Sequence, residues 1–187
     1  MIKTRLTAVL DEDMVVEFYR RSVLDLLATL SHGSFVLRIC FYPVEAKRKV
    51  ADWLGKEHVY IPQKGQDLGE RMENGFLAAF AEGFQRVVLI GSDIPDLPGA
   101  ILEEAISSLA LKDAVLGPAL DGGYYLIGFN SGRFLAEAFR GIDWGTPAVF
   151  HRTMTLLNRH NYEVRVLPNG VTLTRMKIWW PSCATMT

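Results

Sequence analysis

The sequence has few cysteines, almost no excess charge and no long apolar run, and each shortage excludes a class of protein. Its two cysteines, Cys40 and Cys183, are too few and too far apart for a disulfide framework or a cysteine metal cluster. The formal net charge of −1 lacks the basic excess that nucleic-acid-binding proteins show. No apolar run approaches the ~18 residues that span a bilayer, and the charged amino terminus does not resemble a signal peptide. We therefore expect a cytoplasmic protein with no membrane span and no nucleic-acid partner.

Several familiar catalytic motifs are missing as well. The sequence contains no Gly-x-Ser-x-Gly elbow, no Walker phosphate loop and no Cys-x-x-Cys pair. Its four histidines do not have the spacing of metal ligands. These absences argue against a serine hydrolase, a P-loop nucleotidase, a thiol oxidoreductase and a histidine-bound metal centre.

The length of 187 residues and the 49% hydrophobic content are typical of one globular domain. Apolar residues at helical spacing, with turn and cap signals at their ends, predict helices over residues 13–30, 43–54, 68–82, 98–109 and 146–160. Short apolar runs predict strands over residues 35–41, 58–61, 86–90, 113–116, 124–129 and 162–167. Strands that alternate with helices predict an α/β fold: a three-layer, Rossmann-like arrangement with a mostly parallel sheet and helices on both faces.

Two carboxylates, Asp93 and Asp96, follow directly after the apolar run 87–90. Side chains at the carboxyl ends of strands in an open α/β sheet point into the crevice where such sheets bind ligands. Carboxylates there suit Mg²⁺ or Mn²⁺, which bridges the phosphates of a nucleotide to the protein. Asp is also common in turns, so Asp93 alternatively caps the turn, and Asp96 alternatively caps the helix near Pro98.

A second stretch, residues 117–128, places the carboxylate of Asp121 beside Gly122 and Gly123. Glycine adopts positive φ and lets backbone approach a ligand closely, so this loop is suited to holding the hydroxyls of a sugar or an acceptor. An Asp-Gly pair also forms tight hairpin turns, and the two roles are compatible.

Five motifs carry a family resemblance, which covers residues 2–167. They occur in family order at residues 3–6 (Lys-Thr-Arg-Leu), 66–72 (Gln-Asp-Leu-Gly-Glu-Arg-Met), 91–95 (Gly-Ser-Asp-Ile-Pro), 121–128 (Asp-Gly-Gly-Tyr-Tyr-Leu-Ile-Gly) and 144–147 (Trp-Gly-Thr-Pro). With these motifs the chain resembles a bacterial branch of the glycosyltransferase-A-like superfamily whose members are labelled nucleotide-diphospho-sugar transferases. More distant relatives are the molybdenum-cofactor and phospholactate guanylyltransferases.

The resemblance implies a metal-dependent nucleotide site. Asp93 and Asp96 would hold the divalent cation, and Asp121 would position or deprotonate the acceptor. Lys3 and Arg5 would neutralise phosphate oxygens, although a solvated pair of terminal charges explains both residues equally well.

Four further residues are candidates for substrate binding, each with a structural alternative. Gln66 and Asp67 would approach the base or ribose, whereas Asp67 is also a good helix N-cap. Arg71 would face the phosphates, and a solvated helix-face arginine is the alternative. Trp144 would stack on a sugar, and a tryptophan at the edge of the core is the alternative.

Both ends of the chain differ from the family pattern. The usual first strand and its glycine-containing phosphate loop do not precede the Lys-Thr-Arg-Leu motif. The tail from about residue 168 lacks the usual aspartate-rich segment, and residues 171–187 contain no acidic residue. We expect one domain over residues 1–187 whose sheet has a slot at the missing strand. Either another segment or a partner chain fills this slot, or the native gene product begins earlier than Met1. The apolar and aromatic tail over residues 171–180 is predicted to pack on protein surface, which favours a homo-oligomer.

Three functions remain open from the sequence. The first is a glycosyltransferase that binds a nucleotide-diphospho-sugar and an unknown acceptor with Mg²⁺ or Mn²⁺. The second is a nucleotidyltransferase, in which a phosphorylated acceptor attacks the α-phosphate of a triphosphate. The third is a degenerate, non-catalytic module that binds a nucleotide or a partner protein.

Overall fold

The computed structural model describes residues 12–94, 97–170 and 182–186. Its helices are α1 (Glu12–Leu30), η1 (Val44–Ala46), α2 (Lys47–Leu54), α3 (Leu68–Ala81), α4 (Gly99–Ser108), η2 (Ser131–Arg133), η3 (Ala136–Phe139) and α5 (Val149–Arg159). Its strands are β1 (Leu37–Phe41), β2 (Val59–Pro62), β3 (Arg86–Gly91), β4 (Ala114–Pro118), β5 (Tyr124–Asn130), β6 (Val164–Val166) and β7 (Ser182–Met186). The predicted α/β class is confirmed, and each predicted helix and strand is present with small shifts at its ends. No helix in these described ranges is both long and apolar enough to cross a bilayer.

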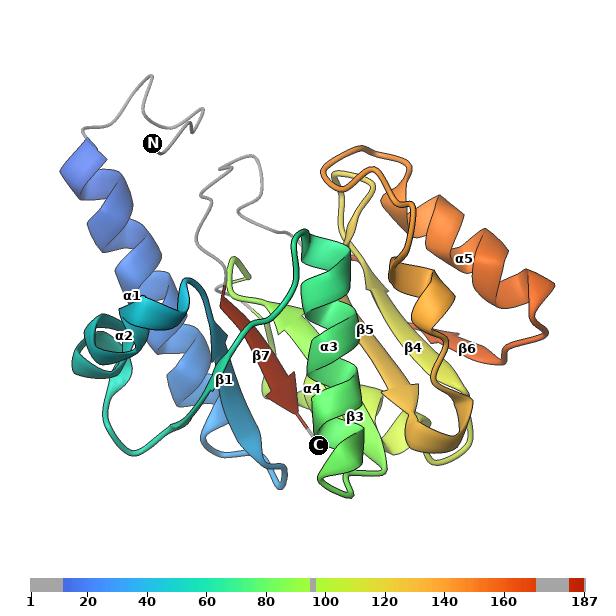
Figure 1. The fold of residues 1–187 in the computed structure, drawn as a ribbon, viewed down its shortest axis with the longest axis horizontal. Coiled ribbons are helices and arrows are strands. Elements are labelled where there is room, and N and C mark those ends of the chain that lie inside the picture. The colour runs from blue at the N-terminus through green and yellow to red at the C-terminus, as the bar shows by residue number, and fades with distance from the viewer. Residues whose placement is uncertain (1–11, 95–96, 171–181, 187) are drawn as a thin grey trace.

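The strands form one sheet in the order β2-β1-β7-β3-β5-β4-β6 (Figure 1). Only the pairs β1–β2 and β4–β6 are parallel, and the other four pairs are antiparallel. The expectation of a mostly parallel sheet was therefore wrong, because the sheet is mixed. One cause is local: β4 and β5 are joined by the short glycine loop, and a connection of that length can only join antiparallel neighbours. The other cause is β7, which runs against both of its neighbours.

Strand β7 lies inside the sheet, between β1 and β3. It pairs with β1 from Leu37↔Met186 to Phe41↔Ser182, and with β3 from Val88↔Met186 to Gly91↔Cys183. Buried backbone groups left without partners cost about 1–3 kcal/mol each, so a strand between β1 and β3 is a large contribution to stability. Residues 182–186 thus fill the position where we expected a slot. The prediction for the tail concerns residues 171–180, which lie outside the described part of the chain.

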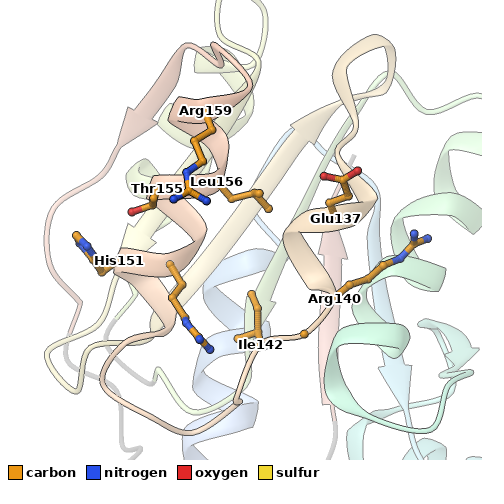
Figure 2. A pocket seen from close by; sticks show the side chains of 9 residues that line it. Glu137, Arg140, Ile142, His151, Thr155, Leu156 and Arg159 are labelled. Carbon is orange, nitrogen blue, oxygen red and sulfur yellow. The ribbon is translucent and has the colours of Figure 1, made fainter.

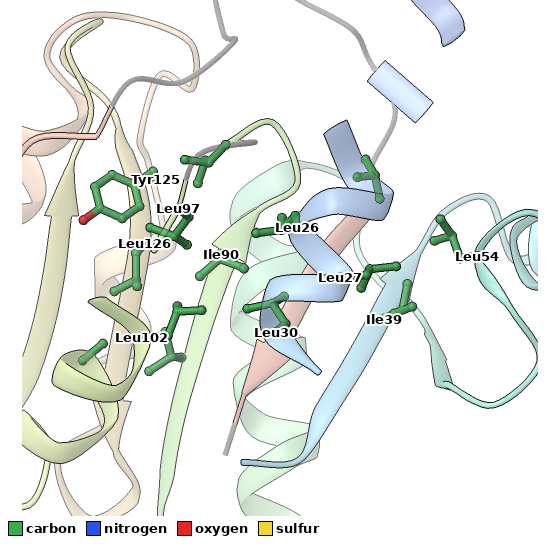
Figure 3. Close-up of a cluster of buried hydrophobic side chains, with 14 of the residues drawn as sticks. Leu26, Leu27, Leu30, Ile39, Leu54, Ile90, Leu97, Leu102, Tyr125 and Leu126 are labelled. Atoms are coloured by element: carbon green, nitrogen blue, oxygen red, sulfur yellow. The ribbon is translucent and has the colours of Figure 1, made fainter. Parts of the chain in front are cut away.

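Helices cover both faces of the sheet, because alternate side chains of β3 belong to two different buried clusters. Val88 and Ile90 belong to one buried cluster, together with residues of α1 and α4. Val87 and Leu89 belong to the other, together with residues of α3, η3 and α5. In Figure 1, α3 lies in front of the sheet and α4 behind it. Figure 3 shows the first cluster, in which Leu26, Leu27 and Leu30 of α1 lie against the sheet. The second is built around Phe76, whose fully buried ring contacts four other phenylalanines.

Candidate functional site

The carboxyl ends of β1, β2, β3 and β4 meet at one edge of the sheet, which is the upper edge in Figure 1. Because β5 is antiparallel to β3 and β4, its first residue, Tyr124, lies at the same edge. The segments that follow these strands begin at Tyr42, Gln63, Ser92 and Ala119. The fold therefore brings three of the predicted motifs to one edge, at residues 66–72, 91–94 and 121–128.

Arg71 is buried, with 8% of its surface exposed. Its Nε donates to the carbonyl of Gly65 at 3.1 Å, and its guanidinium lies 3.9 Å from the centre of the Tyr42 ring. No carboxylate lies within ion-pair distance of it among the described residues, although buried arginines are normally paired. The solvated helix-face alternative is wrong, because α3 directs this side chain toward the loops that follow β1 and β2. A buried cation without a protein anion is a natural phosphate or carboxylate partner.

Gln66 and Asp67 directly precede α3. The Asp67 Oδ1 accepts from the Glu70 backbone N–H at 2.8 Å, and the Gln66 backbone N–H donates to Glu70 Oε2 at 2.7 Å. The capping role of Asp67 is thus confirmed. Its carboxylate is already engaged, which leaves the exposed side chain of Gln66 as the freer candidate for contact with a ligand.

Asp93 lies two residues beyond the end of β3 and is half-buried. Its Oδ1 is 2.7 Å from the position that a Cβ on residue 91 would take, so the carboxylate turns back over Gly91. The neighbouring Ser92 hydroxyl lies 2.6 Å from the hydroxyl of Tyr19, which ties α1 to this loop. Asp96 lies outside the described residues, so its proposed role as a second metal ligand stays a prediction.

The donors at this edge can be compared with what a divalent cation needs. No group of three His, Cys, Asp or Glu side chains that could hold a metal occurs in residues 12–94, 97–170 and 182–186. That excludes a preformed protein cage in this part of the chain. Mg²⁺ commonly takes only one or two carboxylates and completes its shell with water and substrate phosphates. Asp93 at the end of β3 fits this second arrangement.

The glycine loop is a tight turn that is pinned to α5. Gly122 has φ +87°, as predicted, and a Cβ on it would lie 2.2 Å from the carbonyl oxygen of Pro147. Its own carbonyl accepts from the Phe150 N–H at 2.9 Å. The exposed Asp121 accepts from the Gly123 N–H at 3.0 Å. The hairpin role is therefore confirmed, and only Gly122 of the two glycines needs positive φ.

Trp144 is half-buried and packs against the second core cluster. Its ring meets that of Tyr124 edge-on, with centroids 6.3 Å apart. Its Nε1 is 2.9 Å from the position of a Cβ on Gly69 in α3. Trp144 thus joins α3 to the start of β5, as the core-edge alternative expects, and its contact with a sugar stays a prediction. Lys3 and Arg5 lie outside the described residues.

Two residues that the sequence reasoning missed lie beside Arg71. Tyr42 supplies the ring under its guanidinium. Gln63 has a buried side-chain oxygen with no hydrogen-bond partner among the described residues. Both residues directly follow a strand, and that position was the signal that could have identified them. A cavity of about 160 Å³ beneath α3 is lined by Cys40, Ile61, Pro62, Gln63, Lys64, Leu68, Arg71, Met72, Asn74, Gly75, Ala78 and Leu89.

A larger cavity of about 410 Å³ lies between η3 and α5 (Figure 2). None of the predicted site residues lines it. We place the candidate site at the carboxyl edge despite its smaller cavity, because Arg71, the unpartnered Gln63 oxygen and the predicted motifs meet there.

The mixed α/β sheet and the motifs along its carboxyl edge define a protein of the nucleotide-diphospho-sugar transferase fold class, as solved structures show. A "putative nucleotide-diphospho-sugar transferase" from Desulfovibrio desulfuricans G20 is 41% identical, with a TM-score of 0.87 over 90% of this chain and 74% of that chain. A 4-diphosphocytidyl-2C-methyl-D-erythritol synthase from Anaerococcus prevotii shares the fold at 13% identity, with a TM-score of 0.59 over 84% of this chain and 79% of that chain. No curated protein matches significantly. The chain belongs to the family described as an uncharacterized protein conserved in bacteria (DUF2064), which matches residues 25–146. The resemblance stated from the motifs is thereby confirmed.

Proposed function

We propose that this protein is a transferase that binds a nucleotide-diphospho-sugar at the carboxyl edge of its sheet and passes the sugar to an acceptor. The observation that carries the proposal is Arg71, a buried cation with no carboxylate partner among the described residues. A diphosphate would supply the missing anion, and a guanidinium binds phosphate oxygens in a two-pronged, charge-assisted manner. We also propose that the scaffold is of the Rossmann-like, three-layer type, and such sheets bind their ligands at the carboxyl edge.

The residues around Arg71 suggest how the nucleotide would be held. Tyr42 fixes the plane of the guanidinium, and the Gly65 carbonyl fixes its direction. The buried Gln63 oxygen needs a donor, and the N–H groups of a base or the hydroxyls of a ribose are such donors. Gln66 and Lys64 are exposed beside it and would close over the ligand.

Asp93 and Asp96 would hold Mg²⁺ or Mn²⁺. The ion, when bound, would offset negative charge on the diphosphate leaving group. Asp121 is exposed beside the glycine turn and would orient or deprotonate the acceptor hydroxyl. The hydrogen bond from the Gly123 N–H holds the Asp121 carboxylate in the turn, and Gly122 lies against the backbone of Pro147.

A nucleotidyltransferase is the second candidate, since the cytidylyl-type synthase shares the fold. In that reaction the same edge would hold a nucleoside triphosphate, and pyrophosphate would leave as a phosphorylated acceptor attacks the α-phosphate. Lys3 and Arg5 would then clamp the triphosphate.

Product analysis separates these candidates. The full-length protein is incubated with Mn²⁺ or Mg²⁺ and a panel of nucleotide sugars, and separately with nucleoside triphosphates and a panel of sugar phosphates. Release of a nucleoside diphosphate from one nucleotide sugar is the expected result. Release of pyrophosphate would favour the nucleotidyl reaction. Tight binding without either product would leave a binding module and overturn the transferase proposal.

A further inference from the structure

The larger cavity lies between η3 and the exposed side of α5, outside the carboxyl edge (Figure 2). Its volume of about 410 Å³ is within the range of small-molecule pockets, roughly 300–1,000 Å³. Three of its nine lining residues are arginines, and one is acidic. The lining residues are Glu137, Arg140, Gly141, Ile142, His151, Arg152, Thr155, Leu156 and Arg159.

Two of its three arginines carry charge that none of the described residues neutralises. Arg140 forms a two-pronged ion pair with Glu73 of α3, which raises the pKa of Arg140 and uses its charge. Figure 2 shows Arg140 extending away from α5 accordingly. Arg152 and Arg159 form no ion pair with any described residue. Glu137, the only acid in the lining, lies 3.3 Å from His160.

Arg152 and Arg159 are placed to act on one ligand. They are seven residues apart on α5, which is close to two helical turns, so they lie on the same side and about 10 Å apart along the axis. Thr155 and Leu156 lie between them, and Figure 2 shows Arg159 running beside both. Long arginine side chains can converge from that separation onto one anion.

The charge pattern of α5 points to the same class of ligand. Its first turn contains no acidic residue and has Arg152 instead, and Ala148 supplies no side-chain cap. A cation at a helix amino terminus opposes the helix dipole, whereas a bound anion would relieve this repulsion.

We propose that this cavity is a second ligand site that binds a phosphate-bearing small molecule. A phosphate dianion matches two unpaired guanidinium groups in charge and offers more acceptor oxygens than a carboxylate. Ile142 and Leu156 give the cavity an apolar part that would contact the organic body of the ligand. The inference does not rest on the nucleotide site, because no residue lines both cavities.

Phenyl phosphate is a suitable probe, because it carries a phosphate dianion and an apolar ring. We expect calorimetry on the full chain to show that it binds severalfold more tightly than inorganic phosphate. Arg152→Gln and Arg159→Gln should each weaken its binding about tenfold, since each removes one charge-assisted contact. Arg48→Gln on α2 is the control that should bind normally, because Arg48 is also exposed but has a carboxylate oxygen 3.8 Å away.

Both arginines are exposed, so the variants should have the melting temperature of the wild-type protein. Equal binding by the wild type and the Arg152→Gln, Arg159→Gln double variant would overturn the proposal, as would no binding at millimolar concentration. Loss of phenyl phosphate binding in Arg71→Gln alone would also overturn it, because the probe would then occupy the carboxyl edge. A failure of the nucleotide experiment leaves these outcomes unchanged.

Discussion

Gly91 ends β3 without a side chain, and the carboxylate of Asp93 occupies the space beside it. The contact involves the movable end of a side chain rather than backbone, and the backbone at Gly91 does not have positive φ. An added methyl group would therefore push the carboxylate aside at little cost in stability. The position of Asp93 depends on the residue two places before it.

The first prediction follows from this contact. Gly91→Ala should leave the melting temperature nearly unchanged and weaken Mg²⁺-dependent nucleotide binding, because the displaced carboxylate no longer meets the ion. Asp93→Asn should do the same by removing the charge. Calorimetric titration of a nucleoside diphosphate, with and without Mg²⁺, measures both effects. Unchanged metal-dependent affinity in both variants would remove Asp93 from the site.

Tyr125 is 3% exposed, and its hydroxyl donates to the carbonyl of Pro168 at 3.1 Å. Burial, with a smaller contribution from Glu104, raises its pKa to about 12. The unfolded chain ionises its tyrosines near pH 10, so between about pH 10 and 12 only the unfolded state gives up this proton. The stability that Tyr125 contributes is complete below pH 10 and is lost as the pH rises toward 12.

The second prediction is this alkaline loss of stability. Urea unfolding at a series of pH values should show the free energy of unfolding falling more steeply above pH 10 in the wild type than in Tyr125→Phe. Below pH 9 the difference between the two proteins should be constant, reflecting only the lost hydrogen bond. Parallel curves up to pH 12 would contradict the raised pKa.

At the scale of elements, α3 is packed closely against η3 at its amino-terminal end and loosely in its middle. A Cβ on Gly69, in its first turn, would lie 2.1 Å from the Phe139 carbonyl oxygen of η3. A Cβ on Gly75, in the same helix, would have nothing within 4 Å. The amino-terminal end of α3, which presents Gln66 and Arg71, is thus set by its contact with η3.

The third prediction compares these two glycines. Gly69→Ala should destabilise the protein by about 2–3 kcal/mol through overpacking against backbone, which lowers the melting temperature by roughly 4–12 °C in a chain of this size. Gly75→Ala should stabilise it by up to about 1 kcal/mol, because alanine favours the helix. Thermal unfolding followed by circular dichroism measures both. Equal shifts in the two variants would show that η3 does not press on α3.

At the scale of the whole molecule, the sheet is continuous only because β7 joins β1 to β3. Ala184 is opposite Ile39 on one side and Ile90 on the other. A proline at this position removes a backbone donor from a central strand, where proline is not tolerated.

The fourth prediction is that Ala184→Pro destabilises the whole domain and exposes β1 and β3 together. Hydrogen exchange should become fast at the backbone of residues 37–41 and 86–91, and the melting temperature should fall by several degrees. A variant that keeps wild-type exchange in both strands would show that β7 is not the joining strand.

The sequence was sufficient to predict the helices, the strands and the motifs at one edge of the sheet. It was not sufficient to predict which strands pair with each other. The capping signal at Asp67 and the glycine turn at Gly122 depend on residues close in sequence, and both were predicted. The insertion of β7 and the mixed direction of the sheet depend on pairing between distant segments, which periodicity does not report. The burial of Arg71 was missed for the same reason, since Tyr42 and Gly65 come from two different loops.

Arg71 has no carboxylate partner among the described residues, and we propose that it binds the diphosphate of a nucleotide. The measurement that tests this proposal most directly is calorimetric titration of ADP, GDP, CDP and UDP, each with Mg²⁺, into the wild type and into Arg71→Gln and Arg71→Lys. We predict that at least one nucleotide binds the wild type, that Arg71→Gln weakens it by tenfold or more, and that Arg71→Lys falls between them. Arg48→Gln should bind as the wild type does. Equal affinity for that nucleotide in the wild type and in a folded Arg71→Gln variant would contradict the account.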